Sequence, residues 1–476
     1  MNKPRGKALV SGKFQVIHPG HIRLFKLARE ISHELVVALD VSGLGEEDVM
    51  WRVQALQNIN FVGRVLMYEG SIEEVLEKER PGIVVKGSEF AHTVNVEEPF
   101  LSKWGGRLIF SSGDSFFSER DMIPAKSEGQ SRTKPLLPKE FMQRHRISID
   151  RLLELLASFQ GKRVCVIGDL IIDEFINCHP LGMSQEEPTI VVTPIDKKRF
   201  LGGAGIVAAH CASLGADTTL MTVRGDDEVG EWSVEMCSDY GFDLFSIIDS
   251  TRPTTHKQRF RSGAQTLLKL THLRQESISG ELEAELIEKY RSVVQASDVL
   301  IFSDFSYGVL TARVTEEILK MAKLGRVFVA ADSQSSSQMG DLSRFISCDL
   351  ITSTEREARL ELRDENSGLV ILAEKLRSSL AAKNLLLKLG GDGLIIHGMN
   401  QNGGLVVTDQ VPALNDVFID TSGAGDSLLS SSALSLASQA TIYEAALLGS
   451  IVAAIQVGRL GNVPVTKLQV TNLLQV

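Results

Sequence analysis

The stretch that decides the fold of this chain is FIDTSGAGDS (Phe418–Ser427), which runs directly into LLSSSALSLA. A glycine-rich turn opens a helix here, and its glycines allow backbone N–H groups to gather around an anion. Asp426 closes the turn, where its carboxylate can accept a proton from an attacking hydroxyl group. One turn of this kind also fits a simple helix cap, so its surroundings must decide. The chain has no G-x-x-x-x-G-K-[ST] sequence, which argues against a P-loop kinase.

Short apolar runs alternate with helical patterns along most of the chain. The runs expected as strands are KALVSGKF, ELVVALDV, GIVVKG, RLIF, RVCVIGD, DVLIFSD, RVFVAAD, CDLITS and NLLLKLG. Such alternation predicts an α/β fold with parallel sheets covered by helices. The pattern fails between residues 125 and 146, a polar stretch with two prolines. We therefore predict a first domain at residues 1–128, a linker at 129–146 and a second domain at 147–476.

Length and composition narrow the classes of protein. A chain of 476 residues is too long for one ordinary domain. Its formal net charge of -10 argues against a general nucleic-acid binder. The five cysteines are scattered without a C-x-x-C pair, which is typical of a reducing compartment. The N-terminus lacks the apolar core of a signal peptide, and no apolar run is long enough to span a bilayer. The composition therefore predicts a cytoplasmic protein with neither nucleic-acid nor membrane partners.

A second candidate site lies near the N-terminus, where HPGH (His18–His21) follows a strand-like run and precedes an amphipathic helix. The loop brings backbone N–H groups and the positive helix end to one place, where an anion can bind. Two imidazoles there could contact the α-phosphate of a nucleotide and stabilise the charge that develops during attack. A metal site is less favoured because the pair has no obvious third ligand. For an isolated H-x-x-H, the alternative is that both histidines lie in the loop with a structural role only.

The residues around HPGH resemble a family of nucleotidyltransferases that join a sugar or alcohol phosphate to a nucleotide. The pattern G-x-F-x-x-x-H-x-G-H, the segment WRVQAL and the segment VVKGSEF carry the resemblance over residues 7–125. It implies a Rossmann-like domain in which His18 and His21 are catalytic. It also implies nucleotide contacts from Gly12, Phe14, Gly20, Arg52, Lys86, Gly87 and Ser115.

This chain departs from that nucleotidyltransferase pattern at several positions. Gln15 stands where the family usually has Asp, and Lys13 stands where a small residue is common. The segment SGDSFFSER keeps Ser115 but lacks the two threonines expected before the triphosphate. These departures indicate weakened or altered nucleotide binding.

The C-terminal segments resemble the ribokinase-type (PfkB) sugar kinases over residues 147–465. The segments VIGDLIID, FLGGAGIVAAH, RGDDEVGEW, LKLGGDGLIIH and DTSGAGD occur in the family's order. The resemblance implies that Asp426 is the general base and that Glu357 organises Mg²⁺ through water. The anion hole is then Gly423, Ala424 and Gly425; the nucleotide contacts are Lys388, Gly390 and Gly393; and the substrate contacts are Asp169, Asp173, Gly202, Gly203, Lys257 and Arg259.

Further segments, among them GMSQEEPTIVV, THKQRFRSGAQTLLKL and SDFSYGVLT, resemble the heptose-phosphate kinase branch of that family. Members of this branch are commonly fused to a nucleotidyltransferase of the HxGH kind, with the kinase first; here the order is reversed. Ile206 replaces the sugar-contacting Asn, and Thr354 replaces the Asn of N-x-x-E. Two segments that usually carry a lysine contain Tyr307 and Gln334 instead. The departures make the substrate the least determined part of the interpretation.

Together the two resemblances explain why one chain carries both sites. A kinase acting on the anomeric hydroxyl makes a sugar 1-phosphate, and a nucleotidyltransferase consumes it. We expect a bifunctional enzyme of nucleotide-sugar synthesis, as in ADP-heptose synthesis, with a sugar or sugar phosphate, ATP or another NTP, and Mg²⁺. A homodimer is the expected assembly. Two alternatives stay open: a kinase whose first domain only binds nucleotide or uses another substrate, and a non-catalytic descendant.

Overall fold

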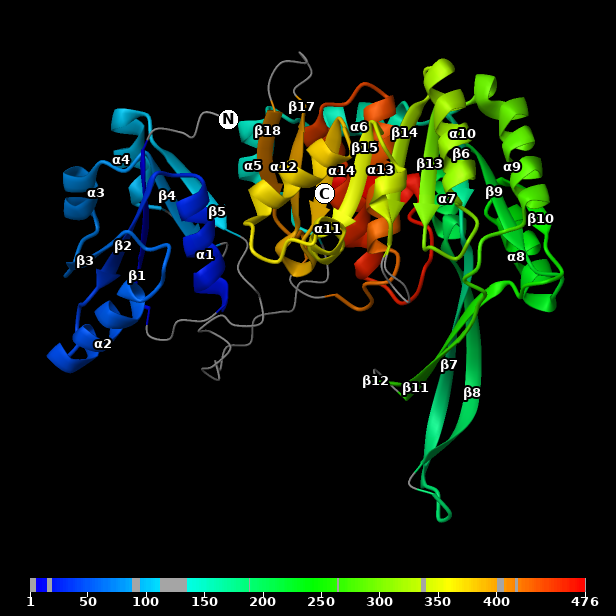
Figure 1. The fold of residues 1–476 in the computed structure, drawn as a ribbon, viewed down its shortest axis with the longest axis horizontal. Coiled ribbons are helices and arrows are strands. Elements are labelled where there is room, and N and C mark those ends of the chain that lie inside the picture. The colour runs from blue at the N-terminus through cyan, green and yellow to red at the C-terminus, as the bar shows by residue number, and fades with distance from the viewer. Residues whose placement is uncertain are drawn as a thin grey trace. The chain divides into compact units, whose positions relative to one another are not determined.

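The computed structural model describes residues 6–14, 19–87, 95–111, 135–187, 189–262, 265–334, 340–399, 406–415 and 418–475. The chain forms two compact units, one mostly from residues 1–130 and one mostly from residues 131–476. Both are built from parallel strands and covering helices, which confirms the predicted α/β fold (Figure 1).

The N-terminal unit has one five-stranded parallel sheet in the order β3-β2-β1-β4-β5. Its strands are β1 (Lys7–Gly12), β2 (Glu34–Asp40), β3 (Arg64–Tyr68), β4 (Ile83–Gly87) and β5 (Arg107–Ser111). Its helices are α1 (Pro19–Glu30), α2 (Glu46–Gln57), α3 (Glu73–Glu79) and α4 (Glu97–Trp104).

The strand order of this sheet determines where a ligand can bind. The apolar runs of β1, β2 and β4 are buried between two layers of helices. Strand order reverses between β1 and β4, and the helices that follow them, α1 and α4, pack in separate clusters on the two faces of the sheet. The carboxyl ends of strands at such a reversal are the usual ligand position. Gly12 and Gly87 end the two strands there.

The C-terminal unit is built on a nine-stranded sheet in the order β10-β9-β6-β13-β14-β15-β16-β17-β18. It is parallel except for β17 and β18, which pair antiparallel. Its strands are β6 (Arg163–Gly168), β9 (Asp217–Arg224), β10 (Asp243–Ile248), β13 (Val299–Asp304), β14 (Phe328–Ser333), β15 (Leu350–Thr354), β16 (Asn384–Lys388), β17 (Leu394–Met399) and β18 (Val406–Val411).

Helices cover both faces of this large sheet. They are α5 (Lys139–Arg144), α6 (Ile149–Ala157), α7 (Ala204–Ser213), α8 (Glu228–Asp239), α9 (Gly280–Val293), α10 (Ala312–Leu324), α11 (Glu355–Leu362), α12 (Leu369–Ser379), α13 (Ala424–Ala437), α14 (Ile442–Val457) and α15 (Lys467–Leu474). Among the described residues, α13 and α14 are apolar or small on nearly all sides, because they lie inside the core with α7. The parallel strands β13 to β16 end together at one edge, close to the start of α13.

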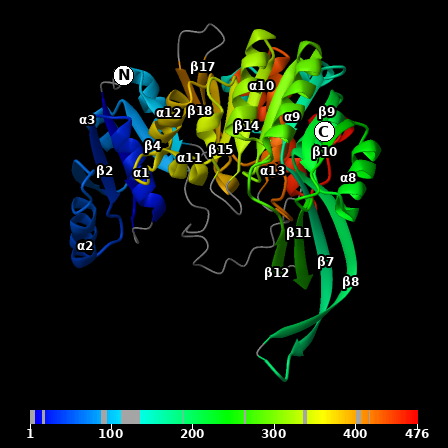
Figure 2. The same ribbon diagram turned by 45° about the vertical axis from the view of Figure 1, so that its right-hand side comes forward.

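A second, four-stranded sheet in the order β12-β11-β7-β8 extends from the C-terminal unit. Its strands are β7 (Leu170–Met183), β8 (Ile190–Gly203), β11 (Thr255–Ser262) and β12 (Gln265–His272). Figures 1 and 2 show the long β7–β8 hairpin leaving the large sheet, with β11 and β12 beside it. Its base lies next to α7 and carries Asp173 and Gly202.

Part of the predicted linker 129–146 packs with the C-terminal unit. Residues 135–146 belong to the C-terminal unit: Phe141 on α5 and Ile147 lie in its core, and Leu136 N donates to Leu414 O. Arg144 and His145 both contact the Asp409 carboxylate of β18. Helix α5 has only six residues and directly follows two prolines, so its pattern is too brief to indicate a helix. We propose the second domain as residues 135–476.

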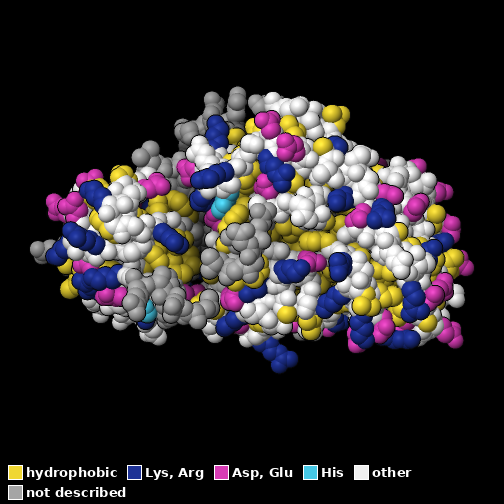
Figure 3. Space-filling model, turned by 90° about the horizontal axis from the view of Figure 1, so that it is seen from above, with side chains coloured by type: hydrophobic (Ala, Val, Ile, Leu, Met, Phe, Trp, Pro, Cys, Tyr) yellow, Lys and Arg dark blue, Asp and Glu magenta, His cyan; other side chains and the backbone are white. Residues whose placement is uncertain are grey.

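Within the described residues, no helix has the length and apolar character needed to cross a membrane. All five cysteines lie in the C-terminal unit, buried as free thiols. Lys and Arg side chains are interspersed with Asp and Glu on the face shown in Figure 3.

Candidate functional site

The glycine turn before α13 has the geometry of an anion cradle. Gly423 is the N-cap residue with φ of 75°, a left-handed conformation that favours glycine. Ala424, Gly425 and Asp426 form the first helical turn, where backbone N–H groups point out of the helix. Asp426 is 6% exposed, and its Oδ1 accepts a hydrogen bond of 2.9 Å from Gln334 Nε2. The turn thus places a buried carboxyl group beside the backbone N–H groups of the helix N-terminus, of which Ala424 N donates to Thr421 O at 3.3 Å.

Burial, reinforced by the neighbouring Asp332 carboxylate, raises the pKa of Asp426 to about 7. Lys388 and the hydrogen bond from Gln334 act in the opposite direction. A carboxyl group with this pKa exchanges a proton readily near neutral pH, which is the property required of a general base.

A buried ion pair lies under the turn. Lys388 Nζ at the end of β16 is 2.9 and 3.0 Å from the two carboxylate oxygens of Asp332 on β14. Burial alone would lower the pKa of Lys388, but the Asp332, Glu357 and Asp426 carboxyl groups together outweigh burial and raise that pKa, so the ammonium stays charged. A Cβ atom on Gly425 would lie 3.2 Å from Lys388 Nζ. Lys388 thus brings its ammonium beside the glycine turn, and its predicted contact with nucleotide stays a prediction.

Gly390 and Gly393, the other predicted nucleotide contacts, follow β16 with φ of 64° and 86°. A Cβ on Gly393 would lie 2.1 Å from Val411 O, so this position needs glycine for its backbone alone. Their predicted contact with nucleotide stays a prediction.

The opposite side of the turn faces Asp173, which is 7% exposed on β7. Burial raises its pKa, against the influence of Arg259 and Lys257. Arg259 Nη2 lies 3.6 Å from Asp173 Oδ1, and Arg259 Nη1 donates to Ser422 Oγ at 3.1 Å. A Cβ on Gly202 would lie 2.5 Å from Asp173 Oδ2, so only glycine leaves room for this carboxylate. The structure brings these predicted substrate contacts together beside the turn.

Asp169, another predicted substrate contact, has backbone partners in this structure, and its predicted role stays a prediction. Asp169 accepts backbone N–H bonds from Phe305, Tyr307 and Val309 through its two oxygens and is almost fully buried. Burial and the nearby Asp304 carboxylate raise its pKa to about 6. Asp169 therefore holds the loop after β13. Gly203, with φ of 55°, carries the backbone past Asp169, since a Cβ there would lie 2.3 Å from Asp169 O.

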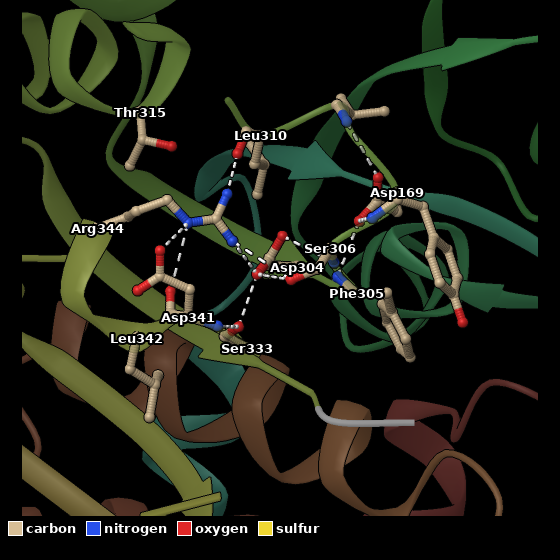
Figure 4. A network of polar contacts seen from close by, with 12 residues as sticks. Asp169, Asp304, Phe305, Ser306, Leu310, Thr315, Ser333, Asp341, Leu342 and Arg344 are labelled. Carbon is tan, nitrogen blue, oxygen red and sulfur yellow. Dashed lines mark hydrogen bonds and ion pairs between the residues drawn. The ribbon is translucent and has the colours of Figure 1, made fainter. Parts of the chain in front are cut away.

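Next to Asp169, a network of polar contacts holds the ends of β13 and β14 (Figure 4). Arg344 Nη2 lies 2.7 Å from Asp304 Oδ2, and its Nη1 donates to Leu310 O. Ser333 Oγ donates to the same Asp304 oxygen at 2.6 Å. Ser333 immediately precedes Gln334, so the network fixes the strand end from which Gln334 reaches the Asp426 carboxylate.

Glu357, the predicted magnesium organiser, lies in the first turn of α11. Its Oε2 accepts a hydrogen bond of 2.7 Å from Thr354 N, and Thr354 Oγ1 accepts one from Glu357 N, so the two residues form a capping box. The Glu357 carboxylate and the Asp332 carboxylate influence each other electrostatically. Among the described residues, no three His, Cys, Asp or Glu side chains gather to hold a metal directly. Such a sparse carboxylate set fits Mg²⁺, which keeps several waters and is bound mainly by substrate phosphates.

Basic side chains line one face of β11. Lys257, Arg259 and Arg261 alternate along the strand and therefore point to the same side. Lys257 Nζ lies 5.1 Å from the centre of the Tyr307 ring, and Arg259 and Arg261 both lie over the Phe175 ring. This row begins next to Asp173 and is half-buried.

In the N-terminal unit, the described part of the HPGH site lies at the carboxyl end of β1. Gly20 and His21 lie at the start of α1, and the His21 ring packs edge-on against Phe14 with 5.1 Å between ring centres. Phe14 is buried with φ of 43°. Phe14 therefore positions His21 and does not present its ring to solvent. His18 and Ser115 lie outside the described residues, and their predicted roles stay predictions.

The two predicted cationic phosphate contacts of this unit are engaged by the protein. Arg52 Nη1 donates to Lys13 O at 2.9 Å, which ties α2 to the loop after β1. Lys86 Nζ, at the end of β4, lies 2.9 and 3.1 Å from the carboxylate oxygens of the buried Glu97. Glu97 offsets much of the charge that Lys86 could offer to a triphosphate.

Sequence reasoning did not assign Asp332 or Asn462. Asp332 ends the strand-like run RVFVAAD, and a polar residue at the carboxyl end of a buried parallel strand was the available signal. Asn462 lies in the loop after α14, where no pattern marks it, yet its Nδ2 donates to Asp173 Oδ2 at 3.3 Å.

The family of the C-terminal unit follows from a comparison with known proteins. Residues 162–467 match the pfkB family carbohydrate kinases, so the chain belongs to this family. The chain is 30% identical over 313 residues to the bifunctional protein HldE of Pelobacter propionicus, covering 64% of this chain and 62% of that protein. It is 31% identical over 331 residues to the HldE protein of Caulobacter vibrioides, covering 68% and 65%. The chain thus spans less than two thirds of the length of these relatives.

The structure of Arabidopsis thaliana ribokinase complexed with ribose and ATP is also similar to this chain. It superposes with a TM-score of 0.52 at 18% identity, covering 67% of this chain and all of that one. This likeness shows that the two proteins share a fold.

Proposed function

We propose that this chain is a bifunctional enzyme that phosphorylates the anomeric hydroxyl of a heptose-type sugar or sugar phosphate and then transfers a nucleotidyl group, adenylyl from ATP, to the sugar 1-phosphate. The observation that carries the first reaction is the buried Asp426 carboxyl group beside the anion cradle, with Asp173 on its other side. The name of the HldE relatives supports the pairing of two activities.

In the kinase step, Asp426 removes the proton from the anomeric hydroxyl as its oxygen attacks the γ-phosphorus of ATP. The bond from that phosphorus to the bridging oxygen breaks, and ADP leaves. Backbone N–H groups of the Gly423–Gly425 turn stabilise the negative charge on the transferring phosphoryl group. Lys388 adds a fixed positive charge under the same turn.

Mg²⁺ supplies neutralisation of the phosphate charge when it is bound. Glu357 would hold it through water, because its carboxylate is anchored in the helix cap and stands with Asp332 near the phosphate side of the turn.

The basic face of β11 supports a substrate that already carries a phosphate. Lys257, Arg259 and Arg261 give three cations in one row, starting at Asp173. Because Ile206 is apolar and fully buried, the site has lost one polar contact to the sugar. We expect weaker discrimination than in other heptose-phosphate kinases. Steady-state kinetics with heptose 7-phosphate, the unphosphorylated heptose and fructose 6-phosphate test this; exclusive use of heptose 7-phosphate, unaffected by Arg259→Ala and Arg261→Ala, would contradict it.

The second reaction rests on the HPGH motif and on the position of His21 at the strand-order reversal of the N-terminal sheet. A second candidate function is favoured by the ion pair of Lys86 with Glu97: this unit binds nucleotide as a regulatory module, or acts on another substrate. Two separate incubations decide between them, because phosphorylating heptose 7-phosphate gives the 1,7-bisphosphate and not the 1-phosphate. ADP is measured with ATP and heptose 7-phosphate, and pyrophosphate is measured with ATP and heptose 1-phosphate. Release of both products supports the bifunctional enzyme, and ADP alone supports the second candidate.

We also propose a homodimer formed through the four-stranded sheet. Its strands carry large apolar side chains in exposed positions. Ile195 is 70% exposed, and Leu181, Ile190 and Leu268 are exposed as well. Such a surface favours burial against a second copy. In sedimentation velocity, Ile195→Glu should convert dimer to monomer, whereas Leu324→Glu, at an 87% exposed position on α10, should leave the dimer intact.

A further inference from the structure

Within the part of the chain that the structure describes, two buried acceptors beside the glycine turn receive no hydrogen bond. They are Asp173 Oδ1, which has only the ion-pair contact with Arg259 at 3.6 Å, and Asn462 Oδ1, in residues that are 7% and 4% exposed. An unsatisfied polar atom inside a protein costs free energy unless another group satisfies it. Asn462 Oδ1 lies beside Gly423, whereas Lys388 Nζ lies beside Gly425.

The orientation of the Asn462 amide follows from its contact with Asp173. Asn462 Nδ2 donates to Asp173 Oδ2 at 3.3 Å, and a carboxylate can only accept, so the amide nitrogen must face it. Asn462 Oδ1 is therefore turned away from Asp173 and toward the turn. A Cβ atom on Gly423 would lie 2.5 Å from this oxygen, which places it against the anion cradle.

The loop that carries Asn462 is tied to the same turn by backbone contacts. Gly461 N donates to Asp420 Oδ2 at 3.0 Å, while Asp420 Oδ1 accepts from Ser422 N. The buried Gln456 side chain donates both to Gly461 O at 2.9 Å and to Ser422 O at 3.1 Å. These contacts hold Asn462 in place before any ligand arrives.

We infer that Asn462 is a specificity-determining residue, whose Oδ1 accepts a hydrogen bond from one sugar hydroxyl while Asp173 Oδ1 accepts one from another. Sugar hydroxyl groups are the donors that such paired acceptors require. Asn462 thereby supplies a side-chain amide that position 206 lacks, because Ile206 is apolar and fully buried in α7. This inference rests on the proposed kinase function and concerns the sugar side of that site.

The test compares variants on the parent sugar and on its monodeoxy analogues. Removing the acceptor in Asn462→Ala should lower kcat/KM for heptose 7-phosphate by about 10- to 100-fold, with the KM for ATP within about twofold. In the wild-type enzyme, one monodeoxy analogue should show a similar loss. In Asn462→Ala that analogue and the parent sugar should react with nearly equal kcat/KM, because the same hydrogen bond is already absent. Asn462→Ser, which keeps an oxygen but shortens the side chain, is the second variant.

Asn384→Ala is the matched control. Asn384 also has an Oδ1 without a hydrogen-bond partner, but it lies at the start of β16, at the other end of the strand from Lys388. It should change the melting temperature without changing kcat/KM for the sugar. If Asn462→Ala loses activity equally for the parent and for every deoxy analogue, or raises the KM for ATP to the same extent, the inference is overturned.

The outcome for Asn462 is separable from that for the proposed function. If wild-type enzyme phosphorylates fructose 6-phosphate but not heptose 7-phosphate, the heptose proposal fails, and the same series on the accepted sugar and its deoxy forms still tests Asn462.

Discussion

The two candidate sites of this chain differ in how their charges are used. In the C-terminal unit, Asp426, Lys388 and Asp173 all surround one turn, so the buried charges face the place where substrates would meet. In the N-terminal unit, Lys86 pairs with the buried Glu97 and Arg52 binds a backbone oxygen. The charged side chains of the first site surround the glycine turn, whereas the cations of the second contact a carboxylate and a backbone oxygen of the protein. A glycine-rich motif therefore says less about activity than the partners of the charges around it.

The largest effect should come from Asp426→Asn. The substitution removes the base and leaves the N–H groups of the turn in place, so sugar phosphorylation should fall about 10²- to 10⁴-fold while ATP binding persists. Coupled detection of ADP and calorimetric titration with ATP measure the two quantities. Kinase activity within a factor of a few of wild type would remove Asp426 from the mechanism.

His21→Ala is the matched experiment in the other unit. Pyrophosphate release from ATP and a sugar 1-phosphate should fall about 10²- to 10³-fold, because one stabilising group at the α-phosphate is lost. The kinase step should be unchanged, since the two units each have their own core. Each variant thus serves as the control for the other. Loss of both activities in one folded variant would mean that the two sites are not independent.

A smaller effect is expected from Glu357→Gln. Glutamine preserves the capping box with Thr354 and removes only the charge, so the Mg²⁺ concentration for half-maximal kinase activity should rise about 10-fold. Glu444→Gln makes the same change in the capping box of α14 and should leave the Mg²⁺ dependence unaltered. Equal Mg²⁺ curves for wild type and Glu357→Gln would exclude this residue from metal binding.

The smallest effect is a displacement of the pH profile. Asp426 must be ionised to act as a base, so kcat/KM of the kinase should rise with pH around a midpoint near 7. The double substitution Lys388→Met and Asp332→Asn removes both members of the ion pair. It removes the Lys388 ammonium, which lowers the pKa of Asp426, and the Asp332 carboxylate, which raises it. The raising influence of Asp332 is the larger, so the midpoint should move to lower pH. A midpoint that stays fixed would show that the pair does not act on Asp426.

The same ionisation affects stability with the opposite sign. Because folding raises the pKa of Asp426 from 3.8 to about 7, the folded state favours the protonated form. Wild type should therefore lose stability relative to Asp426→Asn as the pH rises from about 4 to about 7, and thermal unfolding across this range measures it. Parallel curves would contradict the raised pKa.

Contiguous motifs could be predicted from the sequence because their geometry is local. The turn at Gly423–Asp426 and the strands that lead to it occur where the sequence indicated. The four-stranded sheet was missed because long parts of β8 and β12 are exposed on both faces and lack the alternation of a half-buried strand. Asn462 was missed because its position depends on a loop held by Gln456 and Asp420 from elsewhere in the chain. The partners of Asp169 could not be predicted because they are backbone N–H groups, which no residue pattern reveals.

Two side chains from different strands lie beside Gly425, and one of them carries the charge of the ion pair under the turn. Gln334 occupies a segment that commonly carries a lysine in similar kinases, and its Nε2 would lie 3.9 Å from a Cβ on Gly425. Lys388, two strands away in the sheet, brings its ammonium to 3.2 Å from the same point. Side chains that follow β14 and end β16 therefore reach the same place beside the turn. A reading of the sequence position by position records an uncharged residue at Gln334, whereas the folded chain holds an ammonium at that place.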